Sequence, residues 1–211
     1  MFFFRSLCQK KMAIIQFKIS LLGSQPLIWR RFQVRDDYRM DRFHQVIQIV
    51  MGWDNKHLHE FQLEDRRIGM ILDGMDDFEG ENLEDENEWF LKDLGLKAGD
   101  RFGYWYDFGD DWKHVLEVEE ITEGTLDLPT LLDGERACPQ EDCGGIGGHQ
   151  SIIEFLKDPV NAEDQYWREW LPEDYDPADF SIRETNAELA KFGKWHNRYP
   201  KKRSTPWHQI D

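Results

Sequence analysis

The chain has 211 residues, a formal net charge of −16 at pH 7 and an aromatic content of 14%. A negative surface repels phosphate backbones and anionic lipids, which argues against non-specific binding to nucleic acids or membranes. No apolar run approaches the roughly 20 residues that a membrane-spanning helix needs. Three cysteines, Cys8, Cys138 and Cys143, are too few for a disulfide framework, so we expect a cytoplasmic protein.

The first eleven residues precede any periodic pattern. Their sequence, MFFFRSLCQKK, has no charged segment before its phenylalanines, unlike a secretory signal peptide. We therefore expect residues 1–11 to be a weakly ordered extension, with Met12 as an alternative start.

Alternating apolar and polar residues predict a β-hairpin over Ile14–Val34. Apolar side chains recur at every second position of the first strand, which is typical of a strand with one wet face. Residues 23–26 form the turn. The alternating residues of the second strand are Ile28, Arg30, Phe32 and Val34.

The period then changes to that of a helix. Apolar residues lie at i, i+3, i+4 and i+7 over Phe43–Val50, with Asp41 near the start and Gly52 suited to the C-terminal cap. His44 lies at the edge of this apolar stripe, where a packing role is expected. The helix has one face to bury, and the hairpin offers the surface.

Further strands are expected up to Ile121. HLHEFQL, His57–Leu63, predicts a third strand whose odd positions share one face. The remaining elements, in chain order, are a short strand at Ile68–Leu72, an exposed acidic loop at Asp73–Glu88, a strand at Arg101–Asp107, a tight turn at Phe108–Asp111 and a long strand at Trp112–Ile121. The order of hairpin, helix, strand and hairpin predicts an α+β fold with a β-grasp-like mixed sheet.

The remainder of the chain reads as a loop followed by helices. Two segments fit the S-x-x-E capping box, Ser151 with Glu154 and Ser181 with Glu184. A further helix carrying Tyr166, Trp167 and Trp170 has Asn161 as its candidate cap. We expect one domain over residues 12–190, with a sheet half at about 12–122 and a loop and helical half at about 123–190 packed on it.

A basic tail, residues 191–211, completes the chain. Lys191–Arg203 contains six Lys or Arg residues and no acid. Two interpretations stay open: contact with nucleic acid or an acidic partner, or a solvated helix end whose cations complement an acidic body.

Five motifs in order resemble the plasmid pRiA4b ORF-3-like family. They are PLIWRRFQV, FHQVIQIVMGW with HLHEF, YDFGDDWKHVLEVE, ACPQEDCGGIGG and DPADFSIRETNAEL, and the resemblance spans Ile14–Leu189. It implies an α+β protein with a β-grasp-like sheet, from a largely uncharacterised family found on plasmids and as passengers of insertion elements. A resolvase activity does not carry over, because neither Ser6 nor Ser20 has the arginine cluster that a serine recombinase needs.

Histidines and aspartates suggest a site at one end of the sheet. His57 and His59 lie two apart, and Asp107, Asp110 and His114 surround the turn of the second hairpin. The three histidines are candidate ligands of Zn²⁺ or another divalent metal, with Asp107 or Asp110 beside them. The alternative is structural, with partly buried histidines and turn-capping aspartates.

The segment CPQEDCGGIGGH, Cys138–His149, is the second candidate region. Its C-x4-C spacing does not fit a zinc ribbon, and its glycines indicate a loop that turns with positive φ close to other backbone. Candidate ligand-binding residues are Asp107, Asp110, Trp112, Cys138, Asp142, Gly144 and Gly145. Glu141 as base and Cys143 as nucleophile, activated by His114 or His149, are candidate catalytic residues.

The four tryptophans of the sheet half, Trp29, Trp53, Trp105 and Trp112, are expected to fill its core. Because no nucleotide-binding or hydrolase motif is present, the preferred hypothesis is a binding module with a His/Asp/Cys-lined pocket for a protein, peptide or small ligand. The alternative is a metal-dependent enzyme, most simply a hydrolase, and a third is association with nucleic acid through the basic tail.

Overall fold

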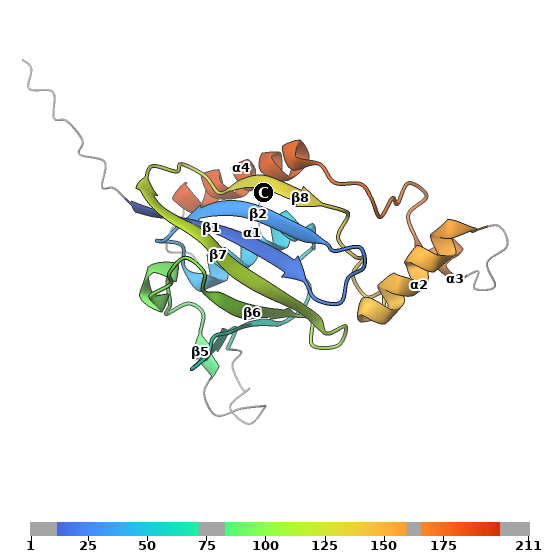
Figure 1. Ribbon diagram of the computed structural model, residues 1–211, viewed down its shortest axis with the longest axis horizontal. Coiled ribbons are helices and arrows are strands. Elements are labelled where there is room, and N and C mark those ends of the chain that lie inside the picture. The colour runs from blue at the N-terminus through green and yellow to red at the C-terminus, as the bar shows by residue number, and fades with distance from the viewer. Residues whose placement is uncertain (1–11, 72–82, 160–165, 199–211) are drawn as a thin grey trace, which may run out of the picture.

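The computed structural model describes residues 12–71, 83–159 and 166–198. Within these ranges the strands form one eight-stranded sheet with the order β5-β4-β3-β6-β7-β1-β2-β8 (Figure 1). The strands are β1 Met12–Leu21, β2 Trp29–Arg35, β3 His59–Gln62, β4 Arg67–Gly69, β5 Leu83–Asp85, β6 Arg101–Tyr106, β7 Trp112–Gly124 and β8 Thr130–Glu135. Neighbouring strands are antiparallel except β4 and β5, which are parallel.

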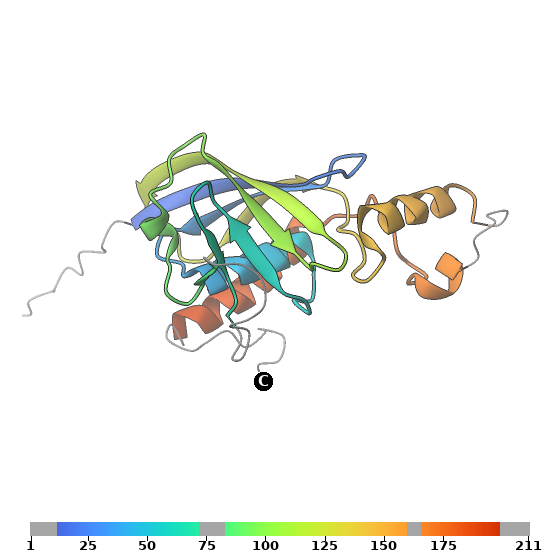
Figure 2. The same cartoon turned by 90° about the horizontal axis from the view of Figure 1, so that it is seen from below.

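The helical elements are α1 Met40–Met51, the 3-10 turn η1 Leu91–Leu94, α2 Gly145–Lys157, α3 Tyr166–Trp170 and α4 Ile182–Arg198. Helices α1 and α4 cover one face of the sheet, whereas α2 and α3 lie beyond one end of it (Figures 1 and 2). The described part of the chain has no helix that is both long and apolar enough to cross a bilayer.

Alternation along β1 builds the core. Phe17 on β1 lies against Phe32 of β2, with ring centroids 5.7 Å apart, and against Phe43 of α1, at 4.9 Å. All three side chains are buried. The predicted hairpin and helix are thus confirmed, and Gly52 ends α1 in the left-handed conformation at φ 97°.

Helix α1 is buried on every side. The sheet covers its apolar face, and α4 covers much of the rest, where the guanidinium of Arg42 lies 4.3 Å from the ring of Trp195. Asn186 of α4 exchanges two hydrogen bonds with the backbone of Leu131 in β8, at 2.8 and 2.9 Å. Helix α4 therefore joins the edge of the sheet to the helix layer, and Ser181 caps it as predicted by accepting the Glu184 N–H.

Three expectations are corrected. Thr130–Glu135 is an edge strand, not a loop. Ser151 lies inside α2 and donates to the Gly147 carbonyl, so it is no cap, because α2 already begins at Gly145 within the glycine-rich segment. The part of the acidic stretch after residue 82 forms β5 and the buried residue Glu86.

Other expectations are met only in part. The order of hairpin, helix, strand and hairpin is present in a mixed α+β fold. The comparison with a β-grasp sheet stays a prediction, since the central neighbours β1 and β7 are antiparallel. Trp53 and Trp112 are core residues, whereas Trp29 and Trp105 are only partly buried. Residues 1–11, Asn161 and the tail after residue 198 lie outside the described ranges.

The start of α2 generates a test of stability. Gly145 has φ 68°, and a Cβ atom there would lie 2.3 Å from the carbonyl oxygen of Asp110. We expect Gly145→Ala to lower the free energy of unfolding by about 2 kcal/mol or more, through strain and steric overlap. Gly147→Ala is the control, because nothing lies within 4 Å of the added Cβ. A helical alanine there should be neutral or raise stability by up to about 1 kcal/mol. Urea unfolding measures both, and equal stabilities would contradict the packing described for Gly145.

Candidate functional site

A cleft of about 610 Å³ opens where the C-terminal end of α1, the loop 137–142 and the segment 170–185 meet. We call this the α1–α4 cleft. Its lining contains seven acidic residues, Asp54, Glu141, Asp142, Asp174, Asp176, Asp179 and Glu184, and two basic residues, Arg30 and Lys56. The lining also contains four aromatic residues, Trp53, Trp170, Tyr175 and Phe180.

Arg30 lies at the inner end of the α1–α4 cleft. It is 1% exposed, and its N–H groups donate to four backbone carbonyls, those of Val50, Trp29, Glu135 and Arg136, at 2.7 to 2.8 Å. Burial lowers the pKa of this guanidinium to about 10. It stays charged at neutral pH, but it is held by carbonyls and by the ring of Phe180 at 3.9 Å.

Glu141 fixes the loop 137–142 to the residues after α1. Its Oε1 atom accepts hydrogen bonds from the Asp54 N–H at 3.0 Å and from the Tyr106 hydroxyl at 2.7 Å. The same hydroxyl accepts the Lys56 N–H, and Lys56 Nζ lies 3.6 Å from Glu141 Oε2. The contacts give this predicted base a positioning role in the loop.

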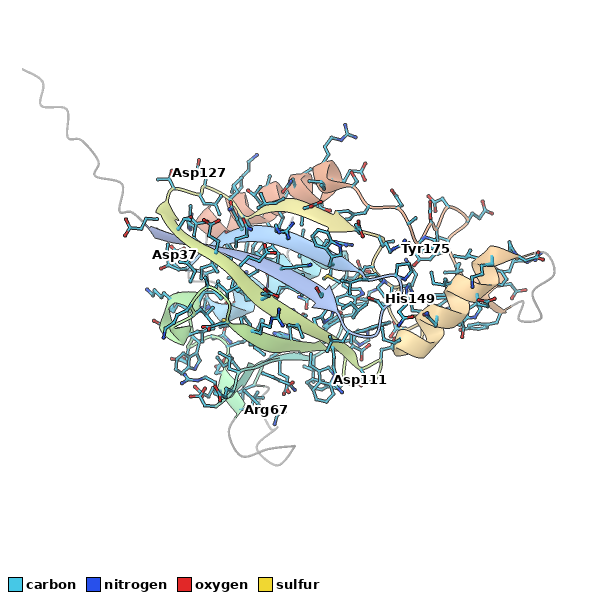
Figure 3. The ribbon with its side chains drawn as sticks, in the orientation of Figure 1. Asp37, Arg67, Asp111, Asp127, His149 and Tyr175 are labelled. Atoms are coloured by element: carbon cyan, nitrogen blue, oxygen red, sulfur yellow. The ribbon has the colours of Figure 1, made fainter. Side chains whose placement is uncertain are left out.

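The partly buried Tyr175 and the buried Cys138 face the α1–α4 cleft. Tyr175 comes from the segment between α3 and α4 and lies at the end of the sheet nearest α2 (Figure 3). Its hydroxyl is buried without a hydrogen-bond partner in the described chain, and burial raises its pKa. Cys138 is buried and free, and burial likewise raises the pKa of its thiol. A thiol in this state is a packing group rather than a nucleophile.

His57, Asp107 and Asp142 form a second, smaller cluster beside the α1–α4 cleft, which we call the His57 cluster. His57 Nε2 lies 3.6 Å from Asp107 Oδ2 and 3.2 Å from Asp142 Oδ1. Among the described residues this is the one group of three potential metal ligands whose ligand atoms all lie within 4.8 Å of one another. The structure thus brings together three of the residues that the sequence singled out.

Asp110 has a different place, in the β6–β7 turn. Its carboxylate accepts the Gly144 N–H at 3.1 Å, just before α2, while Asp107 Oδ1 accepts the N–H groups of Gly109 and Asp110. Gly144 has φ 88°, and Gly145 passes close to the Asp110 backbone. Asp110, Gly144 and Gly145 therefore dock the hairpin on the start of α2.

His59 is the first residue of β3 and lies in different surroundings from His57, which precedes the strand. Its ring stacks on that of His44 with centroids 3.4 Å apart, and its Nε2 lies 2.7 Å from the buried carboxyl group of Glu86. His44 in turn contacts the Tyr104 hydroxyl and the Asn55 side chain, at 2.9 and 2.6 Å. Burial lowers the pKa of both histidines to about 3, so both are neutral members of the core.

His114 is also a core residue. Its Nδ1–H donates to the carbonyl of Tyr104 at 3.2 Å, its ring packs edge-on to Trp53 at 5.1 Å, and burial lowers its pKa to about 4. Trp112, a candidate ligand contact, is fully buried and lies 5.9 Å from Trp53. The predicted set of three metal-binding histidines is therefore spread over separate environments, and only His57 lies near two carboxylates.

Cys143 does not have the surroundings of a nucleophile. It is buried with its Sγ 3.8 Å from the Gly145 carbonyl, and burial raises the pKa of the thiol to about 12. Burial also lowers the pKa of His149, which opposes the imidazolium that would activate a thiol. His149 lies in α2 (Figure 3), and Cys143 contacts Gly145 at its start, so both residues support the beginning of this helix.

Several cleft residues were not identified from the sequence. The most informative is Arg30, whose position among the alternating residues Ile28, Phe32 and Val34 is a detectable signal, because a charged residue on an inward-facing strand position needs partners. Tyr175, Asp174 and Asp179 come from an irregular segment and have no comparable signal. Glu86 lies within the acidic stretch Asp73–Glu88, where nothing in the sequence distinguishes it from exposed acidic residues.

The buried histidines predict the dependence of stability on pH. His44, His59 and His114 have pKa values of about 3, 3 and 4 when folded. These lie below about 6.5 for the unfolded chain. Above that pH the three histidines are neutral in both states and leave the stability of the fold intact. As the pH falls below it, the unfolded chain binds protons that the folded chain excludes. The free energy of unfolding then falls by about 1.4 kcal/mol per pH unit for each histidine. Glu86 acts oppositely, because burial raises its pKa to about 7 and the folded state then holds the extra proton.

We therefore expect the free energy of unfolding in urea to fall between about pH 6.5 and about pH 5. Glu86→Gln keeps an acceptor for His59 and removes the opposing titration, so its stability should fall more steeply. A wild-type profile that is flat or rises in acid, or a shallower profile for Glu86→Gln, would show that the histidines are not the dominant titrating groups.

Comparisons with known proteins agree with this fold. The family model described as plasmid pRiA4b ORF-3-like protein matches residues 13–184. The uncharacterised protein y4hQ of Sinorhizobium fredii (strain NBRC 101917 / NGR234) is 33% identical over 201 residues, covering 90% of this chain and 98% of that protein. The crystal structure of a protein of unknown function, MM3350 from Methanosarcina mazei Go1, has 33% identity and a TM-score of 0.71, covering 82% of this chain and 97% of that chain. The chain therefore belongs to the plasmid pRiA4b ORF-3-like family.

Proposed function

We propose that the protein is a binding module whose α1–α4 cleft receives a positively charged side chain of a peptide or protein partner. The observation that carries this proposal is the cleft lining, with seven acidic residues against two basic ones around four aromatic residues. The cytoplasmic location and the single-domain organisation predicted from the sequence are part of the same proposal.

The charges of the α1–α4 cleft favour a cation. Arg30 is directed at backbone carbonyls, and Lys56 is paired with Asp54 at 2.7 Å, so neither neutralises the carboxylates contributed by the segment 170–185. Asp174 and Asp179 are exposed at the rim. An entering ammonium or guanidinium group therefore meets a negative potential, which the charge of the whole chain reinforces.

The aromatic residues and the size of the α1–α4 cleft favour a side chain rather than a bare ion. Aromatic faces attract cations and also bury the methylene groups of Lys or Arg. A volume of about 610 Å³ is within the usual range of small-ligand pockets and accommodates a side chain with its flanking backbone. The Tyr175 hydroxyl, which has no hydrogen-bond partner within the described chain, offers an additional polar contact.

The predicted catalytic residues support binding over catalysis. Glu141 is engaged by Tyr106 and the Asp54 backbone, and Cys143 is a buried thiol with a raised pKa. Activation of a nucleophile needs a lowered thiol pKa or an adjacent free base. Glu141 therefore serves the shape of the α1–α4 cleft, and Cys143 serves the packing before α2.

This function predicts selective binding of short cationic peptides. We expect N-acetylated, C-amidated tripeptides Gly-Arg-Gly and Gly-Lys-Gly to quench tryptophan fluorescence saturably at physiological ionic strength, because Trp53 and Trp170 line the α1–α4 cleft. The double variant Asp174→Asn/Asp179→Asn should bind about tenfold more weakly, or about 0.7 kcal/mol for each lost charge.

The matched control is Glu64→Gln/Glu120→Gln, which removes two exposed charges outside the α1–α4 cleft and should bind normally. The neutral tripeptide Gly-Gln-Gly should not bind. The proposal is wrong if the neutral peptide binds equally well or if both double variants lose affinity equally. Binding of spermidine without binding of either cationic peptide would contradict the peptide partner.

A further inference from the structure

We infer that the His57 cluster, His57 with Asp107 and Asp142, is a binding site for one divalent transition-metal ion. This inference does not rest on the function proposed for the α1–α4 cleft. The three residues come from separate parts of the chain: the segment before β3, the end of β6 and the loop before α2.

The spacing of the ligand atoms fits a shared ion. Zn²⁺ bonds to imidazole nitrogen and carboxylate oxygen at about 2.1 Å, which sets two ligands of a tetrahedral ion about 3.4 Å apart. His57 Nε2 lies 3.6 Å from Asp107 Oδ2 and 3.2 Å from Asp142 Oδ1. All three ligand atoms lie within 4.8 Å of one another. The three ligand atoms therefore need to move only slightly closer together to coordinate one ion.

Asp107 has a buried carboxylate, and one of its two oxygens faces His57. Its side chain is only 10% exposed. Oδ1 accepts the N–H groups of Gly109 and Asp110, which locks the carboxylate plane, while Oδ2 is the oxygen directed to His57. A buried charge requires a compensating partner, and a cation at this position supplies it.

His57 supplies a second, independent observation. Its Nε2 atom is buried and makes no hydrogen bond within the described chain, although two carboxylate oxygens lie within 3.6 Å. Because the distances are short enough, the hydrogen bonds must be absent for reasons of direction: an N–H on this nitrogen would not point at either oxygen. The arrangement is a poor hydrogen-bonded ion pair, but it is a suitable ligand set for an ion that all three atoms contact.

The backbone holds the cluster in place. Asp107 and Asp142 both adopt positive φ, 53° and 61°, as does Asn55 before His57. The Lys56 N–H donates to the Tyr106 hydroxyl at 3.0 Å, and the His57 ring packs edge-on to the Tyr106 ring at 5.9 Å. The ligands are thus positioned by contacts other than those they make with one another.

The ligand chemistry selects the class of ion. An imidazole nitrogen with two carboxylate oxygens suits Zn²⁺, Mn²⁺ or Fe²⁺ better than Mg²⁺ or Ca²⁺, which prefer oxygen alone. Asp142 is 65% exposed, so the solvent side is open to water or another ligand. Asp142 also lines the α1–α4 cleft, which places the ion next to it.

The test uses the full-length protein, treated with chelator and dialysed, and titrated with Zn²⁺ against a chromophoric competitor. We expect one Zn²⁺ per chain, and weak visible absorption bands of coordinated Co²⁺ when that ion replaces zinc. His57→Ala and Asp142→Asn should each weaken Zn²⁺ binding by at least about tenfold, because losing even a group that only orients a ligand has effects of this size. Asp142 is exposed, so its variant should fold normally and decides the matter if His57→Ala is unstable.

The matched control is Asp54→Asn, which removes a nearby exposed carboxylate that pairs with Lys56 and leaves the His57 cluster intact. It should bind Zn²⁺ like the wild type. The inference is overturned if no saturable Zn²⁺ binding occurs, or if His57→Ala and Asp142→Asn bind like the wild type. A failure of peptide binding in the α1–α4 cleft would leave these results unaffected, because no peptide is present.

Discussion

The rest of the structure depends on the buried guanidinium of Arg30. Its side chain projects from β2 into the space between the sheet and the end of α1, where it donates to carbonyls of β2, of α1, of the last residue of β8 and of the residue after it. Lysine could not replace it, because only the planar fork of arginine presents enough donors in fixed directions. The acceptor on α1, Val50, lies in the last turn, where the helix dipole is negative and offsets part of the buried charge.

This arrangement explains why the α1–α4 cleft is at this end of the molecule. Arg30 holds the last turn of α1 through the Val50 carbonyl and the start of the loop 137–142 through the Arg136 carbonyl. Its guanidinium also stacks on Phe180 just before α4. Trp53 continues the attachment by donating its indole N–H to the Pro139 carbonyl at 3.2 Å. The walls of the α1–α4 cleft are thus held from inside the molecule, while Asp174 and Asp179 lie exposed at its rim.

The sequence predicted those parts of the fold in which one residue period extends over many positions. The β1–β2 hairpin and α1 follow directly from such periods. The edge strand β8 was missed because Leu131 is its one buried residue, so no alternation exists to detect. The alternation predicts His57 and His59 on one face of a strand. The strand β3 begins only at His59, and Asn55 has positive φ, so the alternation does not extend to His57.

For the candidate site, the sequence identified residue types better than their partners. The sequence predicts a site containing His57, Asp107 and Asp142, but it also places His59 and His114 there. Spacing along a strand does not show which side chains already have partners in the core. His59 is taken by Glu86 and His44, and Glu86 lay in a run of acids that resembled a solvated loop. Partner choice in a buried network depends on contacts between distant residues, which a single sequence does not display.

The glycine-rich segment shows how such contacts convert a suggestive motif into a structural one. Of its polar members, Glu141 binds Tyr106 and Cys143 packs beside Gly145, so both face their own scaffold. Asp142, between them, is turned outward by a positive φ of 61° and is the member left to face His57. The side chains of Glu141 and Cys143 therefore fix the backbone of the loop on both sides of Asp142. Because this backbone is fixed, the exposed carboxylate of Asp142 can contribute to both the α1–α4 cleft and the His57 cluster.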